Sequence, residues 1–465
     1  MILSQKDLSF SLVCIIPPDS KRKILYEIPS NVVEITNIPL QILPAGRSKF
    51  SEKEEEIFAS IEMPLLKMQH NPTLENLRNI KSTLDQIGKP IGANLLMNSI
   101  LAWRMLVRMY LGTMGYSSFL NYFWTWRGLM GSFYSIMLAD IPQAEVYHAL
   151  CTGYAGLFLA RAHIEMKKPC VLTEHGIYTN ERRIEIASAE WLYNQASMNL
   201  SIERLRYERD LKDYWIDTFS GYSNLSYEAA SIIITLFKEN QEFQLADGAD
   251  PSKLKIIPNG IHYDFYSSIK KEKQARPTIA LIGRVVPIKD TKAFINTVHL
   301  LKNRIPNIQA FIVGPTEEDP EYYEECCDLV KENHLEDNII FTGKVNAEEI
   351  YKKIDVLVLT SLSESQPLVI LEAGAAGIPC VATNVGSCRE LIYGREDEKP
   401  KLGRGGAVCP LKDPNSMAEE IYILLSNEKL NHQYGQNLKE RVKRNYQLTF
   451  QDQTYHDLYM DLYRT

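Results

Sequence analysis

The sequence lacks several patterns that identify common protein classes. None of its eight cysteines forms a Cys-x-x-Cys pair, although Cys326 and Cys327 are adjacent. It also contains no His-Glu-x-x-His and no Asp-x-Asp segment, and such segments are typical of metal-dependent sites. We therefore expect reduced thiols and no bound metal.

Basic blocks and long apolar runs are also missing. The formal net charge is −7, and the lysine-containing cluster Lys270–Lys273 is short and mixed, so we expect no nucleic-acid partner. The N-terminus lacks the basic flank and apolar run of a signal peptide. Residues 95–138 are rich in aromatic and apolar side chains, but arginines interrupt them before the roughly 18 apolar residues that a membrane span needs. We predict a cytoplasmic protein in which these residues form buried or interfacial helices, and peripheral contact with a membrane complex stays open.

Apolar strands and helices alternate along the chain. The predicted strands of the second half are residues 278–282, 308–313, 338–341 and 356–359. Each is a nearly continuous apolar run, which is typical of a parallel sheet covered on both faces. The first half follows the same pattern less regularly. We therefore predict an α/β chain with two Rossmann-like domains that face each other across a cleft.

The polar, lysine-containing stretch 262–277 predicts a linker between these domains. We expect an N-terminal domain over residues 1–265, with a helical insertion at about 50–140, a C-terminal domain over 266–446, and a terminal helix over 447–465. Within the N-terminal domain, residues 52–69, 94–111 and 180–213 are each predicted to form one continuous helix.

Two carboxylates eight residues apart mark the strongest candidate site. Glu364 lies in a loop before a predicted helix, Glu372 lies inside that helix, and Pro367 is expected at its first position. The unpaired amides of a helix start can bind an anion. The residues at this helix start are Ser365, Gln366 and Leu368. Two hydroxyl-binding carboxylates beside an anion site suit a sugar that carries a diphosphate.

The loop after strand 278–282 contains Gly283, Arg284 and Lys289. Open α/β sheets bind ligands at the carboxyl edge of their strands, so the two cations are candidates for phosphate binding. Two solvated loop cations are the alternative. Lys344 and Val345 follow another strand of the same half and are a weaker candidate for the same pocket.

Two histidines follow predicted strands of the first half. His148 ends the strand 144–148, and His175 follows the strand 169–173. Both would lie at one sheet edge, facing the cleft, beside glycines that open the backbone. A purely structural role for each histidine is the alternative.

These motifs together resemble the family 4-type retaining glycosyltransferases, which have the GT-B fold. The resemblance lies in the Glu-x7-Glu spacing of Glu364 and Glu372, in the Gly-Arg-x-x-x-x-Lys loop from Gly283 to Lys289, and in the Thr-Gly-Lys-Val loop. The first-half segments 119–127, 147–156 and 173–182 further resemble the PelF-type enzymes of Pel exopolysaccharide synthesis.

The resemblance implies a UDP-sugar donor, a growing polysaccharide as acceptor, inner-membrane export partners and no metal cofactor. Arg284 and Lys289 would bind the diphosphate, Glu364 the sugar hydroxyls and Glu372 the ribose. The backbone of Lys344 and Val345 would meet the nucleobase, and His148 and His175 would orient the sugar or acceptor. The acceptor would attack from the face that the leaving phosphate occupies. The terminal helix would cross back to the first domain.

PelF-like chains open with a strand and a Gly-Gly loop that this sequence does not contain before its first predicted strand. The alternative prediction is therefore a catalytically impaired subunit that binds a nucleotide sugar or acts as a scaffold. Storage-polysaccharide synthesis of the glycogen-synthase kind shares the donor chemistry, and the first-half segments disfavour it.

Overall fold

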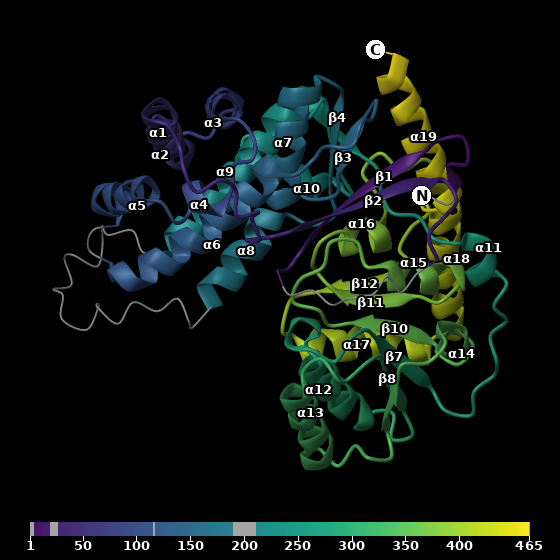
Figure 1. Cartoon of the computed structure of the whole chain (residues 1–465). Coiled ribbons are helices and arrows are strands. Elements are labelled where there is room, and N and C mark those ends of the chain that lie inside the picture. Colours follow the sequence, from purple (N-terminus) through teal and green to yellow (C-terminus); the bar gives the residue numbers. More distant parts are fainter. Residues whose placement is uncertain (1–3, 19–26, 115–116, 189–210, 465) are drawn as a thin grey trace. The chain divides into compact units, whose positions relative to one another are not determined.

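The computed structural model describes residues 4–18, 27–114, 117–188 and 211–464 (Figure 1). The chain divides into two compact units. The first comprises Met1–Thr235, Gln241–Lys255 and His456–Thr465, and the second comprises Leu236–Asn240 and Ile256–Tyr455. Among the described residues, no helix combines the length and the hydropathy needed to cross a bilayer.

The first unit contains two sheets. Its four-stranded sheet has the order β3 (Tyr147–Ala149), β4 (Cys170–Glu174), β5 (Ile232–Thr235), β6 (Leu254–Ile256), with β3, β4 and β5 parallel. The second sheet is a parallel pair of β1 (Phe10–Ile16) and β2 (Val32–Pro39). The helices between strands are α7 (Tyr154–Met166), α8 (Tyr178–Ser188), α9 (Leu211–Ala229) and α10 (Lys238–Ala246).

A group of helices precedes β3 in the same unit. Its members are α1 (Glu52–Ala59), α2 (Glu62–His70), α3 (Leu74–Ile87), α4 (Ala93–Leu96), α5 (Ile100–Thr113) and α6 (Phe119–Leu138). The second half of α6 is buried on every side, from Leu129 to Met137, as expected of a helix that is apolar all round. This helical core is therefore built around α6.

The second unit contains one six-stranded sheet in which every neighbouring pair is parallel. Its order is β12 (Gly406–Cys409), β11 (Cys380–Thr383), β10 (Val356–Leu359), β7 (Thr278–Ile282), β8 (Gln309–Val313), β9 (Ile339–Gly343). The helices are α11 (Tyr263–Ser267), α12 (Thr291–Lys302), α13 (Pro320–Glu332), α14 (Ala347–Tyr351), α15 (Leu368–Ala375), α16 (Cys388–Tyr393), α17 (Pro414–Ser426), α18 (Glu428–Asn445) and α19 (Leu448–Arg464), whose last residues belong to the first unit.

Two apolar cores flank this sheet. Ile279 and Leu281 of β7 belong to the core formed with α12, α13 and α17, whereas the intervening Ala280 belongs to the core formed with α15, α16 and α18. Successive strand side chains point to opposite faces, so a strand covered on both faces is apolar at every position. This confirms the predicted parallel, doubly covered sheet.

Three local predictions are corrected by the structure. The predicted helix 52–69 is two helices, α1 and α2. Pro64 has no backbone N–H to donate to the Ser60 carbonyl, so one continuous helix does not run through this point. The predicted helix 94–111 breaks where the Ser99 hydroxyl accepts a hydrogen bond from the Ala102 amide and begins α5. Pro367 is the N-cap of α15 and not its first residue, with ψ 108° and its carbonyl accepting from Ile370.

Residues 180–213 were also predicted to be helical. The described residues at both ends of this segment are helical, in α8 and α9, and residues 189–210 lie outside the described residues.

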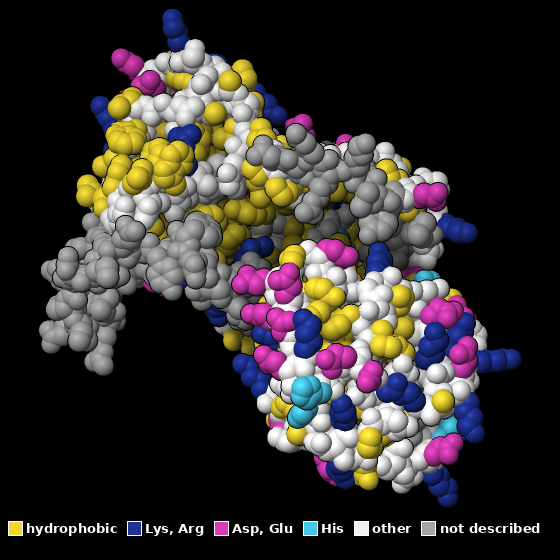
Figure 2. Space-filling model, turned by 90° about the horizontal axis from the view of Figure 1, so that it is seen from below, with side chains coloured by type: hydrophobic (Ala, Val, Ile, Leu, Met, Phe, Trp, Pro, Cys, Tyr) yellow, Lys and Arg dark blue, Asp and Glu magenta, His cyan; other side chains and the backbone are white. Residues whose placement is uncertain are grey.

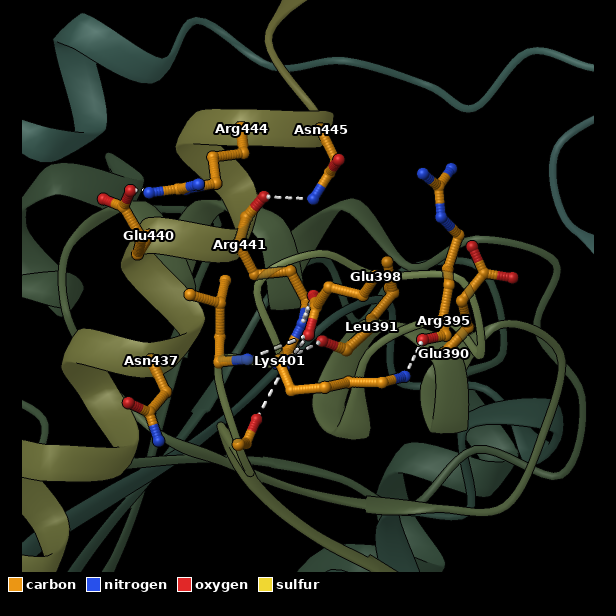
Figure 3. A network of polar contacts seen from close by, with 12 residues as sticks. Glu390, Leu391, Arg395, Glu398, Lys401, Asn437, Glu440, Arg441, Arg444 and Asn445 are labelled. Carbon is orange, nitrogen blue, oxygen red and sulfur yellow. Dashed lines mark hydrogen bonds and ion pairs between the residues drawn. The ribbon is translucent and has the colours of Figure 1, made fainter.

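A buried ion pair joins α18 to the loop after α16 (Figure 3). The Arg441 and Glu398 side chains are 1% and 5% exposed, and Arg441 Nε donates to Glu398 Oε1 at 2.6 Å. Arg441 Nη2 also donates to Glu398 Oε2, and the other guanidinium hydrogens go to the backbone carbonyls of Leu391, Ile392 and Gly403. Every strong donor of Arg441 thus has an acceptor, as a buried charge requires.

Candidate active site

The strand order of the second unit defines where a ligand would bind. The chain runs from β7 outward through β8 to β9, returns to the other side of β7 as β10, and continues to β11 and β12. The order reverses between β7 and β10. In open α/β sheets, the crevice at the carboxyl ends of the strands beside such a reversal is the usual ligand site. Lys289 and Glu364 lie in the two loops that leave these strands.

The structure brings Lys289 and Glu364 together. Lys289 Nζ lies 2.5 Å from Glu364 Oε1, and the two side chains are 22% and 13% exposed. The Ser361 hydroxyl donates to the same carboxylate oxygen at 2.6 Å. A cation and a carboxylate are therefore held at the point of reversal, each still reachable from solvent.

Backbone contacts fix both loops. Thr360 Oγ1 donates to the Lys289 carbonyl at 2.8 Å, and the Leu362 amide donates to Ile288. The loop of Lys289 ends at Asp290, whose carboxylate accepts from the Ala293 amide and begins α12. These bonds hold the ion pair in place before any ligand is present.

Two glycines that sequence reasoning missed make this arrangement possible. A Cβ on Gly314, after β8, would lie 2.0 Å from the Gly283 carbonyl oxygen, and one on Gly386 would lie 2.2 Å from the Glu364 carbonyl oxygen. Both residues have positive φ, +143° and +49°, which disfavours any side chain. A Cβ on Gly283 would meet no atom closer than Lys289 Cε, at 3.6 Å. The close approach of the two loop backbones at Gly283 and Gly314 therefore depends on Gly314.

Arg284 is placed differently from Lys289. Its Nη1 lies 2.7 Å from Glu318 Oε2, and both side chains are about half exposed. Exposed pairs of this kind contribute about 0–1 kcal/mol, so Arg284 can exchange Glu318 for another anion at little cost. Arg284 shares the loop of Lys289 but is not bonded to Glu364.

Glu372 lies on α15 between two tyrosines. Tyr351 Oη donates to Glu372 Oε2 at 2.7 Å. The Tyr351 and Tyr266 rings contact each other edge to face, with centroids 5.9 Å apart. Burial and the adjacent Glu372 carboxylate raise the pKa of both phenols. The Tyr351 hydroxyl thus holds the Glu372 carboxylate in a fixed position.

The other predicted residues of this unit lie around the same loops. Gln366 is buried, and its Oε1 accepts from the backbone N–H of Asn259 at 2.7 Å. Its side chain is therefore already hydrogen-bonded to the turn at residues 259–260. Ser365 is half-buried and Leu368 is exposed at the start of α15. Lys344 and Val345 are exposed in the loop after β9.

In the first unit, His148 is bonded at both ring nitrogens. Nδ1 lies 2.6 Å from Tyr459 Oη and Nε2 lies 2.8 Å from Thr173 Oγ1. Removal from water and the proximity of His175 lower the pKa of His148 to about 4, so the ring is neutral at physiological pH. It links β3, β4 and α19, whereas His175 is exposed at the end of β4.

Glu174, beside His175, was missed by the motif analysis. It is almost fully buried, and its Oε2 accepts from Tyr227 Oη and Gln244 Nε2, each at 2.9 Å. Its Oε1 has no hydrogen-bond partner among the described residues. Burial raises the pKa of this carboxyl to about 7. No local motif signals this, because the burial comes from α9 and α10.

We predict that Glu174 makes the stability of the first unit pH-dependent. Its pKa is about 7 in the folded chain and about 4.5 unfolded, so the folded state binds the proton more tightly. The contribution of Glu174 to stability is therefore fully present below pH 4.5 and is lost as pH rises through 7, by about 3 kcal/mol in all. Glu174→Gln should remove this loss and be more stable than the wild type at pH 8.

Urea unfolding followed by tryptophan fluorescence measures this effect, because all five tryptophans belong to the first unit. The control is Glu145→Gln, which removes an exposed carboxylate paired with Lys168 and should leave the pH profile unchanged. Equal pH profiles for the wild type and Glu174→Gln would contradict the prediction.

Comparison with known families places both halves of the chain. Residues 1–252 match the family model described as Domain of unknown function (DUF3492), and residues 264–441 match Glycosyl transferases group 1. The first model covers more than half of the chain. The chain belongs to the DUF3492 family. Its second half is a glycosyl transferases group 1 domain, from a family of transferase enzymes.

Two curated relatives illustrate the match. N-acetyl-alpha-D-glucosaminyl L-malate synthase of Bacillus anthracis is 34% identical over 137 residues, which are 29% of this chain and 34% of that protein. UDP-Gal:alpha-D-GlcNAc-diphosphoundecaprenol alpha-1,3-galactosyltransferase of Escherichia coli is 25% identical over 264 residues, which are 53% of this chain and 63% of that protein. The chain thus spans about a third to two thirds of these relatives.

Solved structures confirm the predicted fold class. Anabaena HepE in complex with UDP superposes with a TM-score of 0.53 at 18% identity, over 68% of this chain and 79% of that one. Sucrose-phosphate synthase from Thermosynechococcus elongatus gives 0.52 at 19% identity, over 69% and 74%. At these identities the likeness establishes the fold alone. The DUF3492 chain has the α/β GT-B fold.

Proposed function

We propose that this protein is a retaining glycosyltransferase that transfers a sugar from a UDP-sugar to a growing exopolysaccharide. The observation that carries the proposal is the Lys289–Glu364 pair, held at the strand-order reversal of a group 1 glycosyl transferase domain. UDP as the nucleotide is supported by fold neighbours from Anabaena, which were solved with UDP and with UDP-glucose.

Lys289 and Arg284 supply the positive charge for the diphosphate. Each is paired with a carboxylate in the free protein, so donor binding would exchange one carboxylate for phosphate oxygens. Cations already aimed at the leaving group stabilise the charge that develops on it, and this kind of preorganised electrostatics is usually the largest catalytic contribution. The first amides of α15 would add to this field.

The two carboxylates would bind hydroxyls of the same donor. Glu364, held by Ser361, would orient the transferred sugar, and Glu372, held by Tyr351, would bind the ribose. The backbone at Lys344 and Val345 would contact the base. The proposal includes no covalent nucleophile: the acceptor would attack from the leaving-group face, and its proton would pass to the departing phosphate oxygen. No step in this scheme requires a metal.

The first unit would contribute acceptor recognition. His175 is exposed at the carboxyl end of β4 and could contact the sugar or acceptor directly, whereas His148 would act by positioning. A polysaccharide acceptor, Pel-type synthesis and inner-membrane export partners are proposed from the resemblance of segments 119–127, 147–156 and 173–182. The second candidate function is a subunit that binds the donor without transferring the sugar.

Nucleotide binding tests the donor site most directly. We predict that Glu372→Ala weakens UDP binding by about 10- to 100-fold, because a charged hydrogen-bond acceptor contributes about 1.5–3 kcal/mol. Titration calorimetry with UDP and with 2′,3′-dideoxy-UDP measures this. The wild type should prefer UDP, and Glu372→Ala should bind both equally.

Glu325→Ala is the matched control, since Glu325 pairs with the exposed Lys292 on another face of the unit. Failure of the wild type to bind any of UDP, ADP and GDP would end the proposal. Binding of UDP without sugar transfer or donor hydrolysis, across a panel of UDP-sugars, would select the non-catalytic alternative. Product stereochemistry, read by NMR, tests retention.

A further inference from the structure

One surface of the first unit combines exposed apolar side chains with an unusual charge pattern. On α5, Ile100, Trp103 and Leu111 are exposed, and on α6 Leu120 and Trp124 are exposed; we call these five residues the α5–α6 patch. The two tryptophans are 45% and 63% exposed and Leu111 is 69% exposed. Figure 2 shows hydrophobic side chains gathered over the helices of this unit, at the left of the view.

The patch lies on a helix that is apolar on two faces. The opposite face of α5 is already buried in the helical core through Met105, Leu106 and Met109, so α5 is apolar on both sides. An apolar outer face on such a helix indicates an interaction surface, because exposed apolar patches are usually covered by a partner or a membrane.

Aromatic contacts make the two helices one continuous surface. The Trp103 ring meets the Phe119 ring at 5.7 Å and the Phe123 ring at 6.2 Å, and Phe123 contacts Trp124 at 5.0 Å. The Arg127 guanidinium lies over Phe123 at 5.6 Å. These contacts hold the rings in position across the gap between the helices.

The segment that carries the patch contains no acidic residue. Residues 86–139 contain no Asp or Glu but four cations, in a chain of net charge −7. Lys89 is paired with Asp140, and Arg108 is paired with Glu62 of α2. Arg104 makes no ion pair with any described residue, and Arg127 donates to the Met97 carbonyl and the Asn98 amide oxygen. Arg104 and Arg127 are therefore two cations of the patch without a carboxylate partner among the described residues.

We propose that the α5–α6 patch docks on an anionic lipid bilayer. Tryptophans beside arginines, with leucine and isoleucine on the same face, are the composition of helices that lie in the membrane interface. The positive charge complements acidic headgroups. A second copy of this chain fits less well, because a two-fold contact through this patch would bring like charges together. The inference concerns a surface distinct from the donor site and does not depend on the proposed reaction.

Co-sedimentation of the full chain with vesicles tests the proposal. The chain should bind vesicles of phosphatidylcholine with 30% phosphatidylglycerol at least about tenfold more tightly than pure phosphatidylcholine, since several cations face the headgroups. Trp103→Ser/Trp124→Ser should abolish binding, and Arg104→Gln should weaken binding to the anionic vesicles by about fivefold. Leu411→Ser/Phe243→Ser, which alters exposed apolar residues elsewhere, is the control and should bind as the wild type does.

Two further measurements separate the alternatives. Brominated lipid should quench the tryptophan emission of the wild type, and Trp103→Phe/Trp124→Phe should lose most of that quenching while keeping the fold by circular dichroism. Absence of wild-type vesicle binding, or equal binding by the serine double variant, overturns the proposal. A concentration-dependent dimer that the same variant abolishes, without vesicle binding, assigns the patch to a second copy instead.

Discussion

Lys289→Met is expected to lower kcat for donor turnover by about 10²–10³-fold, the loss typical of removing one preorganised group that stabilises developing negative charge. The Lys289 ammonium is 2.5 Å from Glu364 and is fixed by the bond from Thr360 to its own carbonyl. Methionine keeps the length of the side chain and removes its charge. Steady-state kinetics with a UDP-sugar, and calorimetry with UDP, measure the effects on turnover and on binding.

Lys292→Met is the matched control. Lys292 lies three residues further along the chain, where it pairs with Glu325 on the surface, so its loss should leave kcat and the affinity for UDP within about twofold, as for other exposed pairs. Should Lys289→Met and Lys292→Met behave alike, the assignment of the donor diphosphate to the strand-order reversal is wrong.

Arg441→Met is expected to have the largest effect on stability, about 3–5 kcal/mol, because it leaves a carboxylate buried without its counter-ion. Glu398 would lose its counter-ion at 5% exposure, and the carbonyls of Leu391, Ile392 and Gly403 would lose a donor. Urea unfolding followed by circular dichroism measures the loss. Hydrogen exchange should locate it in residues 391–405.

The control for this experiment lies one turn away on the same helix. Arg444 pairs with Glu440 at 2.6 Å, but both side chains are exposed (Figure 3). Arg444→Met should therefore cost about 0–1 kcal/mol. The double variant Arg441→Met/Glu398→Gln should be more stable than Arg441→Met alone, because it removes the unpaired charge. A double variant that is no more stable would mean that packing, and not charge, makes Arg441 important.

The second half of the chain could be predicted closely because its signals are local. The strands are mostly apolar, and several helices begin at a capping residue or a proline, such as Asp290 before α12 and Pro320 in α13. The first half was harder. Pro64 and Ser99 interrupt segments that were each predicted as one helix, and the polar sequence of α10 carries little apolar periodicity.

Motif spacing indicated Glu364, Glu372 and Lys289 but not their partners. The pairing of Lys289 with Glu364 joins residues 75 positions apart, and the bond from Tyr459 to His148 joins residues 311 apart. Gly314 and Gly386 were missed because neither belongs to a motif. Each is required only because another backbone segment approaches it.

The sequence by itself determined the secondary structure of the second unit, the parallel sheet and the loops that hold the candidate donor-binding residues, since these follow from the pattern of apolar residues and the turns between them. Only the tertiary structure decided which groups surround each side chain. Burial raises the pKa of Glu174, Lys289 pairs with Glu364, and Trp103 of α5 and Trp124 of α6 remain exposed. Such properties depend on which groups surround a side chain in space, and neighbours along the chain do not specify them.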